Sequence, residues 1–177
     1  MIRFPLLTER LLIRPLRMAD AADLLAVYGD VETMQFLTPD VPRTLDGARD
    51  WVRTKIELFD ADDGLSLWAV ELRETGRVIG DVGLQWEDYG WGGRDVGLGG
   101  RGLRPLWRRG LGAEAAIACL HAGFTELEVG RICAETAPDN VGAQKVLLTA
   151  GFRQLGSNKQ GWPVFGLNRA DWMASAL

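Results

Sequence analysis

The sequence predicts a mixed α/β fold of the α+β kind, with a central mixed sheet of six to seven strands and about four flanking helices. Two observations support this prediction. Between residues 95 and 167, segments typical of strands and of helices alternate as strand–helix–strand–helix–strand. Earlier in the chain, residues 67–72 alternate in the manner of a strand, and Thr75–Gly76 makes a turn into residues 78–84, which predicts a hairpin.

Punctuating residues place the elements of the first half. Residues 11–16 read as a first strand that Pro15 ends, and residues 20–28 as a short helix with apolar side chains at helical spacing. Thr44 can cap a second helix, which continues until Asp63–Gly64 ends it.

The second half begins with an unusually glycine-rich strand at residues 95–103. Glycine inside a strand indicates a bulge or a close approach of another group to the backbone. The longest helix follows, from Gly110 to about residue 127. The remaining predicted elements are a strand at 131–136, a helix at 141–150 closed by Gly151, and strands at 152–155 and 164–167.

Length and composition indicate one domain over residues 1–177, because a chain of 177 residues with 47% hydrophobic residues is ordinary for a globular protein. Cys119 and Cys133 lie in apolar stretches, so we expect free thiols in a reducing compartment. The first residues lack a signal-peptide pattern, and no apolar run approaches the roughly 20 residues of a membrane span. The expectation is a cytoplasmic protein that binds no membrane.

Residues 108–114, Arg-Arg-Gly-Leu-Gly-Ala-Glu, carry the clearest chemical signal. They open the longest helix with backbone amides that lack intrahelical partners, and glycine lets an anion approach those amides. Arg101, Arg104, Arg108 and Arg109 gather positive charge in a chain whose net charge is -4. This local charge favours a compact phosphorylated ligand over nucleic acid, which needs a basic face. Alternatively, the segment is a helix start with solvated arginines.

The glycines at 97–102 also match the dinucleotide fingerprint G-x-G-x-x-G. That fingerprint requires the helix to begin at its glycines, whereas Pro105 intervenes here, so a nicotinamide or flavin site is disfavoured. A strand edge can instead hold an amide-bearing ligand by main-chain hydrogen bonds. A ligand that runs along a strand and ends in phosphates at a helix start describes the pantetheine and pyrophosphate of coenzyme A.

Four segments in this order resemble the GNAT superfamily of acyl-CoA N-acyltransferases, in the branch of ribosomal-protein N-terminal alanine acetyltransferases. The resemblance covers essentially the whole chain and implies the GNAT fold, a twisted, mostly antiparallel sheet. The segments are residues 7–16 with 20–24 (LTERLLIRPL and DAADL), 104–115 (RPLWRRGLGAEA), 131–140 (RICAETAPDN), and 144–147 with 151–152 (QKVL and GF).

The resemblance implies an enzyme that uses acetyl-CoA and no metal. Leu103 and neighbouring main chain would hold the pantetheine arm, and Asn140 would hydrogen-bond it. The amides of Arg108, Arg109, Gly110, Leu111, Gly112 and Ala113 would cradle the pyrophosphate. Arg104, Arg108 and Arg109 are candidates for outer phosphate contacts, with solvated surface arginine as the alternative for each.

The implied reaction is direct attack of a neutral amine on the acetyl thioester, for which a general base is useful. Asp95 is the first candidate for that base, because its strand borders the expected acetyl position, and Glu135 is the second. Glu87 and Asp88 are expected to line the acceptor entrance, and Trp86, Trp91 and Trp162 either shape the pocket or belong to the core. Ala143 replaces a serine of many relatives, so no hydroxyl there can protonate the departing sulfur.

The predicted function is acetyl transfer from acetyl-CoA to a primary amine, either a peptide N-terminus or a small molecule. The alternative is a catalytically silent acyl-CoA-binding module, which Ala143 would favour. Neither nucleic acid nor membrane is expected as a partner, and the protein is expected to be a monomer or a homodimer.

Overall fold

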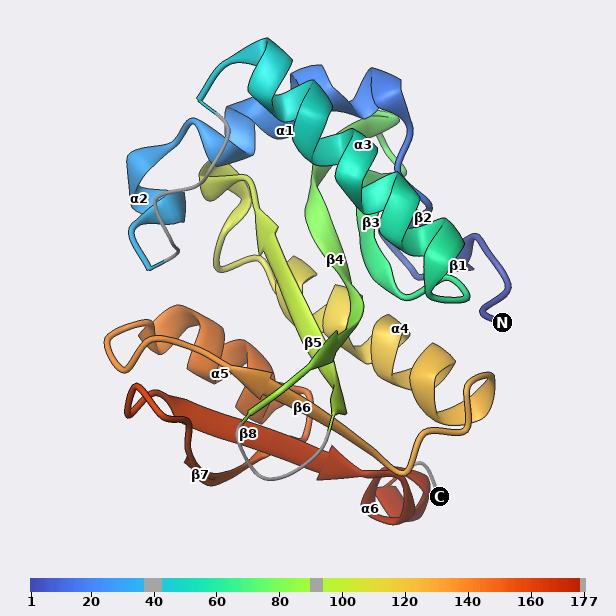
Figure 1. Cartoon of the computed structure of the whole chain (residues 1–177), viewed down its shortest axis with the longest axis vertical. Coiled ribbons are helices and arrows are strands. Elements are labelled where there is room, and N and C mark those ends of the chain that lie inside the picture. Colours follow the sequence, from blue (N-terminus) through green and yellow to red (C-terminus); the bar gives the residue numbers. More distant parts are fainter. Residues whose placement is uncertain (37–42, 90–93, 176–177) are drawn as a thin grey trace.

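The computed structural model describes residues 1–36, 43–89 and 94–175, and one eight-stranded sheet runs through them (Figure 1). The strand order is β1-β2-β3-β4-β5-β6-β8-β7. Neighbouring strands are antiparallel except β5 and β6, which run parallel. The mixed, mostly antiparallel sheet is therefore confirmed, with one strand more than the largest number expected.

The strands are β1 Leu6–Leu7, β2 Leu11–Arg14, β3 Ser66–Leu72, β4 Arg77–Glu87, β5 Asp95–Gly102, β6 Arg131–Glu135, β7 Arg153–Ser157 and β8 Pro163–Asn168. The α-helices are α1 Ala21–Tyr28, α2 Val31–Met34, α3 Leu45–Ala61, α4 Leu111–Thr125, α5 Val141–Thr149 and α6 Arg169–Ser175, and short 3-10 helices cover Met18–Asp20 and Arg104–Leu106. The sequence did not predict β1, α2 or α6, because these elements are too short to show a period.

Capping residues explain where the helices start and stop. The Thr44 side chain accepts a hydrogen bond of 3.1 Å from the Gly47 amide at the start of α3, as predicted. Gly151 follows α5 with a φ of 95°, a conformation that favours glycine. The predicted hairpin is also present, since β3 and β4 pair from Leu72–Arg77 onward.

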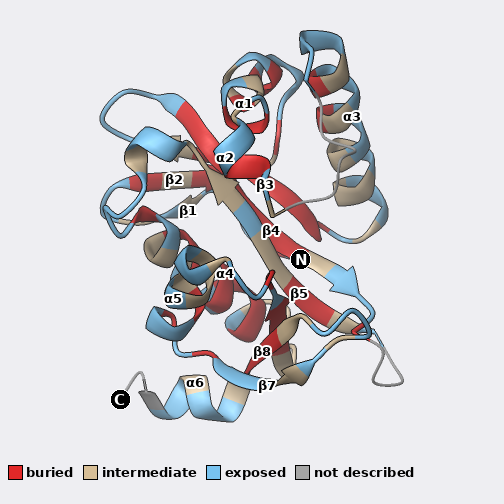
Figure 2. Cartoon of the chain, turned by 90° about the vertical axis from the view of Figure 1, so that its left-hand side faces the viewer, coloured by how far each residue is buried: buried red, intermediate tan, exposed pale blue. Residues whose placement is uncertain are grey.

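Helices cover both faces of the sheet, and the middle strands are the most buried (Figure 2). On one face α1 and α3 form a cluster that includes Leu24, Val27, Tyr28, Ala48 and Val52. On the other face α4 packs Ala116, Leu120 and Phe124 into a larger cluster with Val82, Leu84 and Ile132 of the sheet. Cys119 and Cys133 are buried free thiols, as expected. No helix of the described residues is long and apolar enough to cross a membrane.

The glycine-rich strand β5 has no bulge toward β4, contrary to one expectation, but its backbone is closely approached, which confirms the other. It pairs with β4 in an unbroken register from Gly80–Gly102 to Glu87–Asp95, so no bulge interrupts this ladder. A Cβ built on Gly100 would lie 2.6 Å from the Asp81 carbonyl oxygen, so the backbones do approach closely. Toward β6, by contrast, β5 pairs only at Val96–Ile132 and Gly97–Cys133. The strands part beyond Gly97.

Candidate functional site

Helix α4 begins at a left-handed turn without a capping side chain. Its N-cap residue, Gly110, has a φ of 79° and makes no side-chain capping hydrogen bond. Arg108 also has a positive φ, 62°, which strains a residue that carries a Cβ. Gly110 and Gly112 are exposed. The unpaired amides and the positive end of the helix dipole thus meet at an exposed bend, and this arrangement fits a phosphate group.

The side chains of this first turn pack against the rest of the protein. Leu111 belongs to the core cluster, and Ala113 is half-buried. A Cβ on Gly112 would lie 3.3 Å from Cγ2 of Val146 in α5, so a larger residue would push the two helices apart. The main chain, rather than any side chain, is what the turn offers to a ligand.

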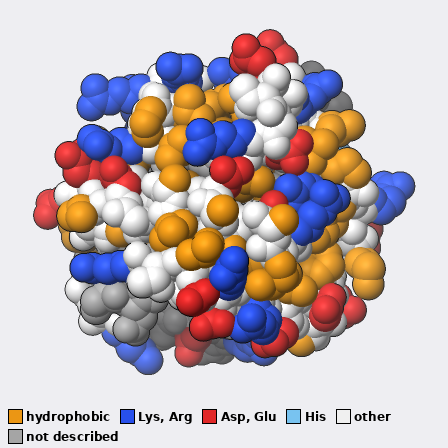
Figure 3. Space-filling model, turned by 90° about the horizontal axis from the view of Figure 1, so that it is seen from above, with side chains coloured by type: hydrophobic (Ala, Val, Ile, Leu, Met, Phe, Trp, Pro, Cys, Tyr) orange, Lys and Arg blue, Asp and Glu red, His pale blue; other side chains and the backbone are white. Residues whose placement is uncertain are grey.

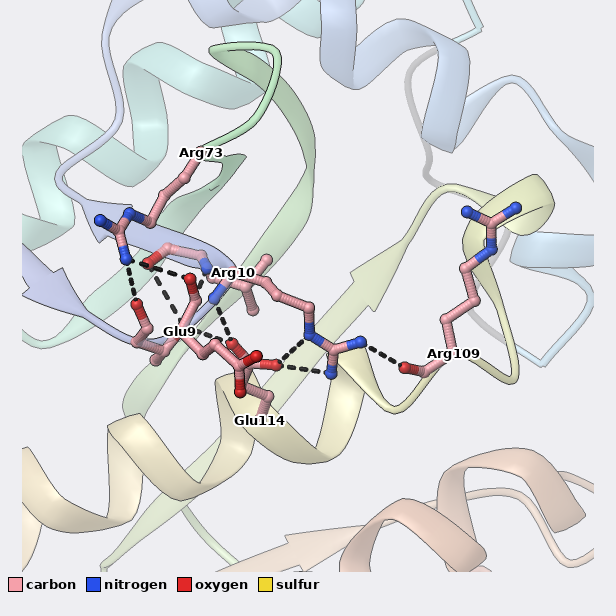
Figure 4. Close-up of polar contacts among 7 residues, drawn as sticks. Glu9, Arg10, Arg73, Arg109 and Glu114 are labelled. Carbon is pink, nitrogen blue, oxygen red and sulfur yellow. Dashed lines mark hydrogen bonds and ion pairs between the residues drawn. The ribbon is translucent and has the colours of Figure 1, made fainter.

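A residue from the N-terminal segment holds the start of α4 in place (Figure 4). Arg10 donates a hydrogen bond of 2.8 Å to the Arg109 carbonyl oxygen and pairs with Glu114 at 2.6 Å. Glu114 also accepts hydrogen bonds from the Thr8 hydroxyl and the Arg10 amide. Desolvation opposes ionisation of Glu114, but these hydrogen bonds outweigh it and hold its pKa below the usual value. We name Thr8, Arg10 and Glu114 the α4 clamp.

The four arginines near this turn do not gather there. Arg104 pairs with Asp30 and Glu32 around α2, at 3.1 and 2.9 Å. Arg101 pairs with Asp81 on β4, at 3.2 Å. Arg108 and Arg109 are exposed beside the start of α4. Arg104 is exposed as well but is held by two carboxylates, so it is the candidate phosphate contact that the geometry favours least. Seen from the top of Figure 1, positive and negative side chains are interspersed, and the described residues form no broad basic face on this side (Figure 3).

The two candidate pantetheine contacts differ in what they leave available. The Leu103 amide donates to the Ile79 carbonyl at 2.7 Å, and its carbonyl accepts from the Leu106 amide at 2.9 Å. The main-chain groups of Leu103 are therefore already engaged. The edge of β5 from Leu98 to Gly102, which has no pairing with β6, is the better candidate for the pantetheine contact. Asn140 uses its side-chain oxygen to cap α5, where it accepts a hydrogen bond of 3.1 Å from the Ala143 amide. Its side-chain amino group is a hydrogen-bond donor, and this is the group that it could offer to a ligand.

A row of polar side chains lies on one face of β4 and β5. Alternation along paired strands puts Asp81, Gln85 and Glu87 of β4 on the same face as Asp95, Gly97, Gly99 and Arg101 of β5. We name these seven residues the polar strip. Intervening residues, among them Val82, Leu84 and Val96, enter the core under α4 instead. Trp86 lies between Gln85 and Glu87 in the strand, so its side chain is on the opposite face of β4 from the polar strip.

The two carboxylates predicted as bases both have partners. Arg131 holds both carboxylate oxygens of Asp95, at 2.7 and 2.8 Å. Both oxygens of Asp95 are therefore engaged in a charge-assisted ion pair. Glu135 is exposed at the end of β6 and accepts a hydrogen bond of 2.8 Å from the Asn158 side chain. The structure brings Glu135 close enough to Glu87 for their charges to interact.

Glu87 is a carboxylate of the polar strip whose surroundings raise its pKa. A Cβ built on Gly97 would lie 2.5 Å from Cγ of Glu87 and 2.6 Å from the Tyr89 hydroxyl oxygen, so both side chains occupy the space above that glycine. Although the residue as a whole is exposed, desolvation of its carboxyl group and repulsion from Glu135 raise the pKa of Glu87, and Lys55 opposes the rise. The Glu87 side chain thus lies over Gly97, which is the last residue of β5 that pairs with β6.

A buried polar cluster continues the strip under α1 and α3. The Tyr28 hydroxyl donates to Asp81, and the Trp51 indole donates to Tyr28 at 2.7 Å. The Arg101 guanidinium lies over the Tyr28 and Trp51 rings, with centroid distances of 5.4 and 5.5 Å. Lys55 donates to Gln85 at 3.1 Å and lies over the Trp51 ring at 4.6 Å. The aromatic rings of this cluster thus hold two cationic side chains, Arg101 and Lys55, beside the polar strip.

Sequence reasoning assigned Glu87 only to the acceptor entrance and gave Tyr89 no role. The alternation of Asp81, Gln85 and Glu87 on a strand opposite a glycine-rich one is the signal that could have indicated them. Tyr89 is buried, and burial followed by the charge of Glu87 raises its pKa well above the usual value, so it keeps its proton. Of the tryptophans predicted to shape the pocket, Trp91 lies outside the described residues and Trp162 is half-buried next to β8.

Comparison with known proteins gives a consistent result. A family model described as an acetyltransferase (GNAT) domain matches residues 10–153. The N-acetyltransferase YoaA of Bacillus subtilis is 27% identical over 158 residues, which cover 89% of this chain and 88% of that protein. The N-acetyltransferase p20 of Bacillus licheniformis is 29% identical, with 85% and 83% of the two chains covered.

Solved structures share the fold at low sequence identity. A GNAT-family acetyltransferase from Bacillus anthracis superposes with a TM-score of 0.77 at 22% identity, covering 96% of this chain and 99% of the other. A ribosomal-protein-S5-alanine acetyltransferase from Vibrio fischeri gives 0.73 at 15% identity, covering 96% and 99%. An aminoglycoside acetyltransferase in complex with coenzyme A gives 0.76 at 18% identity, covering 94% and 99%.

Proposed function

Since this chain belongs to the GNAT acetyltransferase family and transfers an acetyl group from acetyl-CoA to an amine, we propose that its acceptor is the α-amino group of a protein N-terminus and that Glu87 is the general base. The position of Glu87 carries the proposal. Its side chain crosses Gly97, where β5 leaves β6, with Cβ and Cγ directly over that glycine, and the pKa of its carboxyl group is raised. A base with a raised pKa is better matched to proton transfer near neutral pH than an ordinary carboxylate.

The start of α4 and the free edge of β5 form the proposed cofactor site. The main-chain amides of residues 108–113 would bind the pyrophosphate, with the exposed Arg108 and Arg109 beside it. The edge from Leu98 to Gly102 and the Asn140 side chain would bind the pantetheine. Acetyl-CoA, when bound there, supplies the acetyl thioester.

Glu87 would accept the proton that the amine must lose. An α-amino group has a pKa near 8, whereas the lysine side chain lies near 10.4. Deprotonation of lysine therefore costs about 3 kcal/mol more near neutral pH. A single carboxylate base is adequate for an α-amine, and this difference favours a peptide N-terminus over an ordinary lysine as acceptor. The ribosomal-protein acetyltransferase among the structural neighbours supports the same class.

The leaving group needs little help from the protein. A thiol of pKa near 8.5 departs acceptably as a thiolate, so the lack of a hydroxyl at Ala143 slows the reaction without preventing it. Main-chain N–H groups of the open β5 edge would stabilise the tetrahedral oxyanion. The hydroxyl group of Tyr89 lies beside Gly97 and stays protonated, so among the described residues it is a hydroxyl that could donate to the leaving sulfur.

A coenzyme A release assay with matched acceptors tests the proposal. One peptide carries a free N-terminus and no lysine, a second has a blocked N-terminus and one lysine, and a polyamine represents small amines. We expect release with the first peptide to exceed the other two. Preference for the polyamine or the lysine peptide would overturn the acceptor class, and no release with any amine would overturn the assignment of the site.

A further inference from the structure

Lys55 projects from α3 onto the polar strip, although lysines normally keep their ammonium group in water. Its ammonium nitrogen donates to Oε1 of Gln85 at 3.1 Å and lies 4.6 Å from the centre of the Trp51 ring. The residue is half-buried, whereas Lys145 and Lys159, the other lysines of the sequence, are exposed. One primary amine of the protein is therefore already fixed inside the proposed acceptor region.

The register of the sheet shows how close this amine is to the proposed acetyl position. Gln85, its hydrogen-bond partner, is paired with Gly97, the last residue of β5 that pairs with β6. The Gln85 side-chain nitrogen would lie 3.8 Å from a Cβ on Gly99, so the amide lies over the floor of the strip. Glu87 follows on the same face of β4 and interacts with the charge of Lys55. The Lys55 amine, the proposed base Glu87 and the start of the unpaired edge of β5 therefore all lie near Gly97.

We propose that Lys55 is a site of self-acetylation, at which the protein transfers an acetyl group from bound acetyl-CoA to its own side chain when no other acceptor is present. This inference rests on the proposed function, because it uses the same donor site and the same base. The neutral amine attacks the thioester carbonyl carbon, a C–N bond forms, and the C–S bond breaks. Coenzyme A leaves as the thiolate, and the proton lost by the amine passes to Glu87.

The charges around Lys55 favour the neutral amine that this step needs. Desolvation lowers its pKa, and Arg101 on β5 lowers it further. Asp81 and Glu87 on β4 act in the opposite direction but do not cancel the effect. From α1, Tyr28 binds Asp81 and keeps its own proton, because burial raises its pKa. The pKa of Lys55 is therefore lower than the ordinary value of a lysine, which favours the neutral amine.

The test is to incubate the full-length protein with acetyl-CoA alone and to follow all three lysines by peptide mass spectrometry. We expect Lys55 to be acetylated about tenfold faster or more than Lys145 and Lys159, since fixed positioning of an amine alone contributes more than that. Excess free coenzyme A should suppress acetylation of Lys55 and leave the slow reaction of the exposed lysines unchanged. Equal rates at the three lysines, or no suppression by coenzyme A, would overturn the proposal.

Two variants separate this inference from the proposed function. Lys55→Arg keeps the positive charge over Trp51 and should remove the fast acetylation entirely, while Glu87→Gln should slow it at Lys55 only. Coenzyme A release with the N-terminal peptide is measured on the same samples. Release with the peptide but an unmodified Lys55 overturns self-acetylation alone. Fast Lys55 acetylation without peptide turnover supports self-acetylation and overturns the proposed acceptor instead.

Discussion

At the scale of single residues, three carboxylates near one point of the sheet differ in what holds them. Asp95 is bound by Arg131 through both oxygens, and Glu135 is bound by Asn158. Glu87 instead lies where desolvation and a neighbouring negative charge raise its pKa. A carboxylate whose charge is unfavourable gains most by accepting a proton, and for this reason we propose Glu87 as the base.

Glu87→Gln tests this choice. The variant should lower kcat by about 10²- to 10⁴-fold, the usual contribution of a general base. Wild-type activity should fall as the pH drops through the pKa of Glu87, which desolvation and Glu135 raise above its ordinary value. The variant should lose this acidic limb of the pH profile. At pH values above that pKa, the ionised Glu87 carboxylate destabilises the folded protein. The variant should therefore unfold at an equal or higher temperature at pH 7, so misfolding cannot explain lost activity.

Glu135→Gln gives the matched control. Removing its negative charge should lower the pKa of Glu87 and move the acidic limb to lower pH, with kcat at pH 8 nearly unchanged. If kcat collapses in Glu135→Gln and survives in Glu87→Gln, the roles of the two residues are reversed. An Asp95→Asn variant with the strongest loss would return the role to Asp95.

Gly97 makes room for the proposed base, and Gly97→Ala should show it. The new methyl group would meet Glu87 and Tyr89 at 2.5 and 2.6 Å, so both side chains must move. We expect kcat to fall by about tenfold or more, as a small misplacement of a base is costly. Gly99→Ala adds the same methyl on the same face with no neighbour closer than 3.8 Å, and its pH profile should match wild type. Equal kinetics in the two variants would contradict the assignment.

At the scale of elements, most helices and strands follow from local signals, whereas the site depends on how they pair. Thr44, Gly110 and Gly151 mark their helix ends as expected. The glycines of β5 predicted a bulge or a close backbone approach, and the packing of Gly100 on β4 confirms the second. Pairing of Gln85 with Gly97 is a long-range contact that no window of the sequence reveals. For this reason the sequence placed Glu87 only at the acceptor entrance and gave Lys55 no role.

The α4 clamp links the N-terminal segment to the proposed pyrophosphate site, and Arg10→Ala tests that link. Arg10 supports the Arg109 carbonyl and pairs with Glu114, so its loss should loosen the turn that presents the amides. We expect the KM for acetyl-CoA to rise about tenfold, which corresponds to about 1.4 kcal/mol, with kcat within about twofold. The lowered pKa of Glu114 keeps the ion pair intact until the pH falls through that value, so the effect should persist at mildly acidic pH.

Arg3→Ala is the control for the clamp, because Arg3 pairs with Glu126 near the opposite end of the same helix, at 3.4 Å. Its side chain is 89% exposed, and an exposed pair of this kind contributes little to stability. The KM should therefore stay at the wild-type value. A similar KM in both arginine variants, or a fall in kcat alone for Arg10→Ala, would contradict a positioning role.

At the scale of the whole molecule, one sheet carries all the described strands, yet two parts of it share few strand contacts. Strands β1 to β5 form one continuous antiparallel set, and β6, β8 and β7 form another. Two residue pairs join β5 to β6, and α4 packs across both sets. The single domain over residues 1–177 remains a prediction that one cooperative unfolding transition would support.

A ligand between the two sets should stabilise the whole molecule, and a thermal-shift titration measures this. Acetyl-CoA at about 100 times its dissociation constant adds about 2.7 kcal/mol to the unfolding free energy. For a chain of this size, that corresponds to a rise in Tm of about 5–10 °C. Coenzyme A should act similarly and NADH should not, because β5 and α4 lack the dinucleotide geometry. If acetyl-CoA bridges β5 and β6, the transition should stay single and move as a unit. A ligand that shifted only part of a split transition would place the binding site on one set of strands, and no shift with either CoA species would refute the site at α4.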